Sequence, residues 1–187
     1  MIKKYTKEEY DVSDLFNLSK GNLCSAEILF CQEKPEIYIN TLYSAGYLCH
    51  LGIELLLKGC WLYEKEYFYN YHSLKKIINE IEFLNELYEQ NENTISNLEE
   101  FYNMRYPPVL SADQLKEEQK ADITNNLGGE IGDSDWINTI KLLHEIQSKM
   151  PSNLASIAKP IYKIFANTLN EQRYLKGGKL YKLYRYK

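Results

Sequence analysis

The stretch SAGYLCHLGIELLLKG, residues 44–59, decides the fold of this sequence. It is apolar around most of its helical circumference, which is typical of a helix at the centre of a domain. Pro35 is well placed to start that helix, and we expect it to end near Glu64. One stripe of the helix carries only small residues: Ala45, Cys49, Gly52 and Gly59. Because small residues allow two backbones to approach closely, the stripe predicts a tightly packed partner, and we favour the preceding helix over a second subunit.

Apolar residues recur at helical spacing along most of the remaining chain. The expected helices run from Asp11 or Ser13 to Gln32, from His72 or Ser73 to Tyr88, from Asn93 or Thr94 to the prolines at 107 and 108, from Asp133 or Ser134 to Pro151, and from Asn153 to Leu169. Residues 63–71 are expected to form a loop, and residues 109–133 a longer polar connection. Pro160 should kink or split the last helix. This pattern predicts an all-α bundle.

The chain divides into three parts by pattern. Residues 1–10 are an N-terminal segment, residues 11–150 form the helical domain, and residues 151–187 are a helical extension with a basic, tyrosine-rich tail. Within the tail, Gly177 and Gly178 separate two runs rich in Tyr and Leu. This arrangement is typical of a small β-hairpin.

The composition indicates an ordinary cytoplasmic domain. Its 187 residues are 44% hydrophobic with a net charge of −4, and no apolar segment follows the first lysines as a secretory signal requires. The longest uncharged stretch, residues 37–53, is too short and too polar to span a bilayer. The four cysteines form no C-x-x-C pair and the three histidines lack ligand spacing, so we expect neither a metal site nor a cofactor. The 17 tyrosines have AT-rich codons, so we do not treat their number as a functional sign.

Four short motifs follow one another along the chain. Glu54 is followed by three leucines and Lys58, His72-Ser73-Leu74 opens the next helix, FYNMRYPP carries Arg105 before the prolines, and DSDWINTIKLLHEI forms a last helix with an aromatic residue near its start. Their order and spacing together resemble the HEPN family over about residues 11–150. The resemblance implies an antiparallel helical bundle that is often a homodimer. It also implies a nucleotidyltransferase-type protein partner in a toxin–antitoxin or defence system, and action on RNA. Symmetric dimers are the commonest oligomers, so a homodimer is our expectation.

The sequence departs from the ribonuclease members of the family at one motif. Those members carry a histidine that is separated from the arginine by four to six intervening residues, whereas the corresponding positions after Arg105 hold Leu110, Ser111 and Ala112. Because RNA cleavage without metal needs groups that accept and donate protons, and arginine stays protonated, we expect a non-catalytic module that binds RNA, a nucleotide or a protein. One alternative is an RNA endonuclease that uses Arg105 with a displaced His50 or His72. A purely protein-binding accessory subunit is the other alternative.

Two interpretations of the polar stripe on the central helix remain open. The candidate polar cleft comprises Tyr47, His50, Glu54, Lys58 and Arg105. The four residues on the helix recur at spacings of three or four, so they share one face. Either this face is a partly solvated seam that positions the helix ending at Arg105, or it is a ligand cleft in which Arg105 reaches Glu54.

The tail is the candidate nucleic-acid-binding segment. Residues 173–187 contain six basic residues and no acidic one, which leaves a net charge of −10 on residues 1–172. Basic side chains neutralise phosphates, and tyrosines stack on unpaired bases. The candidate RNA-contacting residues are Arg173, Lys176, Lys179, Tyr181, Lys182, Tyr184 and Arg185. Alternatively, a hairpin formed by the tail packs on the acidic body.

Overall fold

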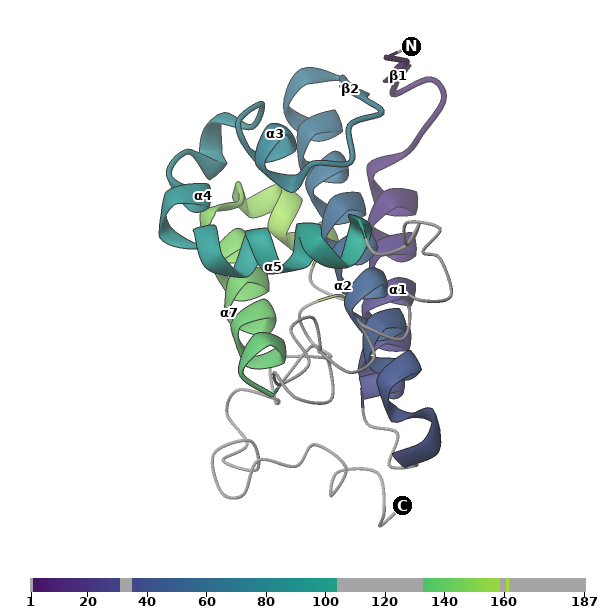
Figure 1. Cartoon of the computed structure of the whole chain (residues 1–187). Helices are drawn as coiled ribbons and strands as arrows, with labels where there is room; N and C mark the ends of the chain where they lie inside the picture. Colours follow the sequence, from purple (N-terminus) through teal and green to yellow (C-terminus); the bar gives the residue numbers. More distant parts are fainter. Residues whose placement is uncertain (1, 31–34, 104–132, 159–160, 162–187) are drawn as a thin grey trace.

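Two long antiparallel helices form the frame of the molecule (Figure 1). The computed structural model describes residues 2–30, 35–103, 133–158 and 161. Helix α1 spans Val12–Phe30, and the central helix α2 spans Pro35–Lys65. The two helices lie side by side, and helices α3 (Leu74–Ile78) and α5 (Glu92–Asn103) pack against α2. The all-α prediction is confirmed, with one small sheet added.

The small-residue stripe of α2 receives side chains from α1. A Cβ atom added at Gly52 would lie 2.6 Å from Cγ of Leu23, and one added at Gly59 would lie 2.5 Å from the Phe16 ring. Ser19 donates a hydrogen bond from Oγ to the Gly52 carbonyl at 2.7 Å, so α1 touches the backbone of α2. The prediction that the preceding helix fills this stripe is therefore confirmed.

A two-stranded antiparallel sheet replaces the loop expected at residues 63–71. Strand β1, Lys4–Thr6, pairs with strand β2, Tyr67–Tyr69, in a register that places Tyr5 opposite Phe68. The Tyr5 and Phe68 rings stack with centroids 5.2 Å apart. The loop expectation was wrong because the pairing strand lies near the N-terminus, far from β2 in the sequence, and local periodicity carries no signal of a distant partner.

The single helix expected from His72 to Tyr88 is broken into three pieces. Helix α3 spans Leu74–Ile78, the 3₁₀ helix η1 spans Glu82–Leu84, and helix α4 spans Leu87–Gln90. Glu86 has a φ of 70°, which no continuous right-handed helix accommodates. Most of the apolar face predicted for that helix still reaches the core: Leu74, Ile77, Ile78, Ile81 and Leu84 are buried. Its last predicted member, Tyr88, is only partly buried, and Leu87 is buried instead.

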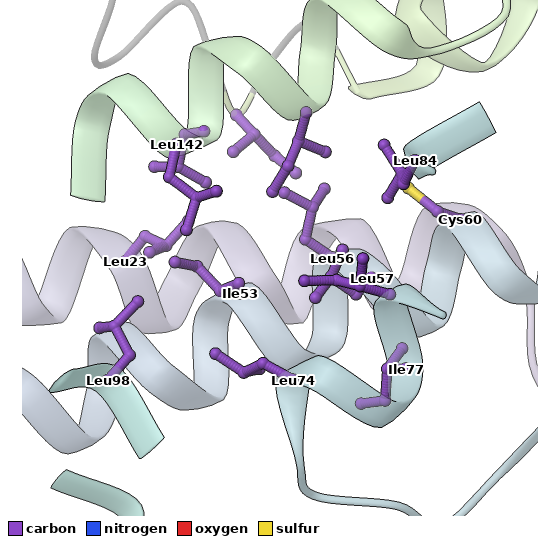
Figure 2. Packing of buried hydrophobic residues seen from close by; sticks show 14 of the residues in the cluster. Leu23, Ile53, Leu56, Leu57, Cys60, Leu74, Ile77, Leu84, Leu98 and Leu142 are labelled. Carbon is purple, nitrogen blue, oxygen red and sulfur yellow. The ribbon is translucent and has the colours of Figure 1, made fainter. Parts of the chain in front are cut away.

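Helices α5 and α7 and the helical residues 152–158 complete the core (Figure 2). Helix α5 spans Glu92–Asn103, and helix α7 spans Asp133–Lys149 from one of its two predicted starts. Leu142 of α7 belongs to the same buried cluster as Leu23 of α1 and Ile53 of α2. Residues 152–158 are helical, as the extension predicted, while the rest of that helix and the expected hairpin lie outside the described residues. No helix in the described ranges combines the length and apolarity needed to cross a membrane.

Candidate functional site

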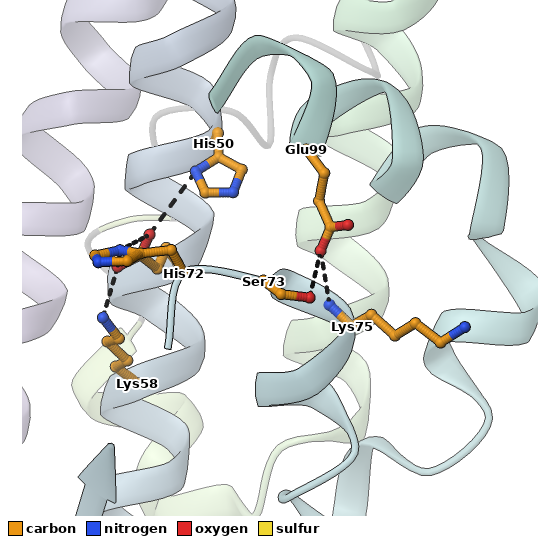
Figure 3. A network of polar contacts seen from close by, with 7 residues as sticks. His50, Lys58, His72, Ser73, Lys75 and Glu99 are labelled. Atoms are coloured by element: carbon orange, nitrogen blue, oxygen red, sulfur yellow. Dashed lines mark hydrogen bonds and ion pairs between the residues drawn. The ribbon is translucent and has the colours of Figure 1, made fainter. Parts of the chain in front are cut away.

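A buried carboxylate on α2 is the centre of the candidate site (Figure 3). Glu54 is 2% exposed, and its Oε1 accepts a hydrogen bond from Lys58 Nζ at 2.6 Å. The two residues are four positions apart on the helix, the spacing at which a glutamate and a lysine face each other. Lys58 is itself only 6% exposed, so this ion pair is held away from solvent.

His72 joins this carboxylate from another element. It lies between β2 and α3, and its Nδ1 is 3.2 Å from both Oε1 and Oε2 of Glu54. The His72 side chain is 48% exposed, whereas that of Glu54 is 3% exposed. A carboxylate that accepts a hydrogen bond from Nδ1 fixes the tautomer and orientation of an imidazole. The second ring nitrogen, Nε2, then remains the polar edge of His72 that is not engaged by Glu54.

Tyr102 of α5 contacts two histidines at once. Its ring stacks on His72 with centroids 5.1 Å apart and an interplanar angle of 18°. It also lies 4.8 Å from the ring of His50, which is fully buried. His50 Nδ1 lies 3.8 Å from Glu54 Oε2, so α5 and α2 hold both histidines around one carboxylate.

Glu99, also on α5, fixes the chain that follows His72. Its Oε1 accepts hydrogen bonds from Ser73 Oγ at 2.8 Å and from the Lys75 backbone N–H at 3.2 Å. Ser73 in turn caps α3, because its Oγ accepts from the Lys76 backbone N–H at 3.3 Å. These bonds position His72 from its C-terminal side (Figure 3). Glu54 and Tyr102 hold its ring.

The structure brings part of the predicted cleft together. His50, Glu54 and Lys58 are in contact, and Tyr47 is partly exposed on the same helix. Arg105 lies outside the described residues, as do the tail candidates Arg173, Lys176, Lys179, Tyr181, Lys182, Tyr184 and Arg185. Sequence reasoning did not assign Tyr102 to the site. Its place within FYNMRYPP, three residues before Arg105, was the available signal.

This cluster offers a ligand one accessible imidazole, that of His72. Glu54 and Lys58 offset each other's charge, and burial keeps His50 from any ligand in solution. His72 can donate to, or accept from, a ligand through its outer nitrogen. Within the described ranges no group of three or more His, Cys, Asp or Glu residues is arranged to hold a metal ion.

The fold and the site thus define a class of protein: an all-α bundle with a buried carboxylate that lies between histidines and a lysine. The HEPN domain family matches residues 12–128, which is more than half of the chain. The chain belongs to the HEPN family. This membership indicates a nucleotide-related, RNA-related or toxin-like function. No curated protein and no solved structure matches the chain.

Proposed function

We propose that this protein binds single-stranded RNA through His72 and does not cleave it. The observation that carries the proposal is the geometry of the His72 ring. The ring is half exposed, its Nδ1 faces the buried Glu54 carboxylate, and one of its faces stacks on Tyr102. Membership of the HEPN family supports a nucleic-acid ligand.

A fixed imidazole suits a phosphate group. While Nδ1–H donates to Glu54, Nε2 can donate to a phosphate oxygen when the ring is the protonated imidazolium. A donor held in place beforehand loses little freedom when the ligand arrives. Glu54, Tyr102 and the bonds around Ser73 already hold the ring and its backbone. His72 therefore has the exposure and the rigidity that a backbone contact requires.

Cleavage requires more than this cluster offers. One group must deprotonate the 2′-hydroxyl and another must protonate the leaving oxygen. The chain has three histidines, of which His50 is fully buried and His144 lies on α7. Lys58 is bonded to Glu54 and almost buried. Among the residues that the structure describes around Glu54, only His72 is placed to meet a substrate.

One observation favours ribonuclease activity as the second candidate. A carboxylate on Nδ1 of a histidine is also the arrangement that orients a general base. Glu54 and His72 have this arrangement, with both carboxylate oxygens 3.2 Å from Nδ1. In that case His72 would deprotonate the 2′-hydroxyl, and Arg105 would hold the phosphate.

Labelled single-stranded RNA, incubated with the protein in metal-free buffer, separates the two candidates. We compare the wild type with His72→Ala and with the matched control His144→Ala, and follow binding by anisotropy and cleavage by gel. We expect binding about tenfold weaker in His72→Ala, since it loses a hydrogen bond to a charged group. His144→Ala should bind as the wild type does, and no variant should cleave.

Two outcomes contradict this proposal. Cleavage by the wild type that disappears in His72→Ala would make the protein a ribonuclease. No binding to RNA at all would direct the search to a protein partner, such as one of nucleotidyltransferase type.

A further inference from the structure

Three tyrosines lie on one side of the extended segment formed by β2 and the two residues after it. Tyr67, Tyr69 and Tyr71 alternate along the extended chain, so their side chains project to the same face. Ring centroids of neighbours are 5.5 Å apart for Tyr67 and Tyr69 and 5.7 Å apart for Tyr69 and Tyr71. We call these three residues the tyrosine ladder.

The ladder has a buried side and a solvent side. Its rings lie 6.3, 5.8 and 5.9 Å from the ring of Trp61, which is fully buried on α2. Each ladder tyrosine is nevertheless partly exposed. Covering Trp61 therefore accounts for the inner side of the ladder and leaves aromatic surface facing solvent.

Lysines lie at both ends of the ladder. Lys4 Nζ is 4.0 Å above the centre of the Tyr67 ring, and Lys76 Nζ is 5.9 Å from that of Tyr71. Both lysines are exposed, and neither is paired with a carboxylate within the part of the chain that the structure describes. The nearby Lys7 differs in this respect, because it pairs with Glu66 at 3.2 Å. The ladder thus combines aromatic rings with positive charges that are not neutralised.

The ladder ends next to the candidate site along the chain. Tyr71 directly precedes His72. Trp61, beneath the ladder, lies three residues after Lys58 on α2, the spacing of one helical face. The ladder and the site are therefore joined by one peptide bond and by the same helix.

We propose that the tyrosine ladder is a stacking track for unpaired RNA bases, with Lys4 and Lys76 on the phosphates, that leads the strand to His72. The inference rests on the proposed function and extends its site. Aromatic rings interleaved with basic groups bind single strands with little sequence preference, because every base has a face to stack. Paired bases hide their faces within the duplex, so the track takes single-stranded RNA and rejects double-stranded RNA.

Charge reversal tests the phosphate contacts. The double variant Lys4→Glu, Lys76→Glu is compared with the control Lys20→Glu, Lys141→Glu, which changes net charge equally on α1 and α7. Affinity for a labelled oligouridine is measured by anisotropy. We expect the ladder variant to bind at least about tenfold more weakly, and the control to lose less than about twofold.

A leucine substitution tests stacking. Tyr69→Leu keeps an apolar cover over Trp61 and removes one aromatic ring, so we expect at least about a fivefold loss of affinity. Tyr88→Leu is the matched control, because Tyr88 on α4 is also partly exposed and lies beneath a lysine, with Lys75 Nζ 4.2 Å from its ring centre. Thermal unfolding of each variant establishes that it folds.

The outcomes separate this inference from the function on which it rests. If His72→Ala weakens binding while folded ladder variants bind as the wild type does, the ladder is only a cover for Trp61 and the inference is wrong. Competition by duplex RNA equal to that by the single strand also overturns it. If the ladder variants lose affinity and His72→Ala does not, the track stands and the His72 site is wrong. No binding of oligouridine by the wild type overturns both.

Discussion

At the scale of single residues, the ion pair between Glu54 and Lys58 is the most constrained feature of the site. Both side chains are almost completely buried, and their charged atoms are 2.6 Å apart. Removing two charges from water costs several kcal/mol for each ion, and their attraction offsets that cost only while both are present. The free energy that the intact pair contributes to the fold is therefore smaller than the free energy lost when either member alone is removed.

Substitutions at this pair should be strongly coupled. Lys58→Met leaves the Glu54 carboxylate buried without its nearest cation, and Glu54→Gln leaves the ammonium without its anion. We expect each single change to lower the free energy of unfolding by about 3 kcal/mol, and the double change to cost less than the two together. Urea unfolding of the four proteins measures the coupling. Strictly additive losses would contradict it.

Glu27 on α1 is a second buried carboxyl, and it makes stability depend on pH. Burial raises its pKa from the ordinary 4.5 to about 7. Between these values the folded protein keeps a proton that the unfolded chain releases. The stability contributed by this group is therefore fully present below pH 4.5 and is lost as the pH rises through about 7.

Glu27→Gln should remove this dependence. A neutral amide of similar shape has no charge to bury, so we expect the variant to exceed the wild type in free energy of unfolding by about 2 kcal/mol at pH 8. At pH 5 the folded wild type is already protonated at Glu27, and the difference should be much smaller. Urea unfolding at the two pH values measures both. An equal difference at each pH would show that packing, and not charge, is responsible.

At the scale of secondary-structure elements, the contact between α1 and α2 depends on glycine. A Cβ at Gly52 would lie 2.6 Å from Leu23 Cγ, and Leu23 is fully buried among core residues. We expect Gly52→Ala to destabilise the protein by about 1–3 kcal/mol through overpacking. Gly21 on α1 is the matched control, because a Cβ there meets nothing within 4 Å. Gly21→Ala should stabilise the helix by up to about 1 kcal/mol.

Thermal unfolding of both alanine variants decides this point. Equal effects would mean that helix propensity alone governs the two positions. Opposite effects would establish that the small residues in this stripe of α2 allow α1 to pack closely against it.

The long elements were predictable because their signals are local. The all-round apolarity of α2 and its small stripe predicted a central helix in close contact with α1, and Asp133 was among the predicted starts of α7. The breaks between α3 and α4 were not predictable from apolar spacing, because one helix and three short pieces bury the same residues. The pairing of Tyr5 with Phe68 joins distant parts of the chain, which periodicity does not report.

The same distinction applies to the site. Spacing of four along α2 predicted that His50, Glu54 and Lys58 share a face, and the structure places them in contact. The placement of Tyr102 against both histidines depends on how α5 crosses α2. That crossing is a property of packing between elements, so no local pattern predicted it.

At the scale of the whole molecule, charge is divided unequally along the chain. Residues 173–187 carry six positive charges, while the chain as a whole has a net charge of −4, so residues 1–172 carry −10. A body with this charge repels RNA at long range, although exposed lysines such as Lys4 attract it locally. For the RNA binding that we propose, the tail is therefore the part of the sequence best suited to attract the ligand to the acidic body.

Truncation after Asn170 should therefore weaken RNA binding and reduce its dependence on salt. Each phosphate neutralised on a single strand contributes about 0.7 to the slope of log affinity against log salt, so loss of six basic residues should reduce the slope by up to about 4. The truncated chain keeps Ile161, a fully packed core residue, so its melting temperature should stay close to that of the wild type. Anisotropy titrations over a series of salt concentrations measure the slope. Unchanged affinity and slope in a folded truncated protein would exclude the tail from RNA binding, and the attraction would then have to come from the lysines of the body itself.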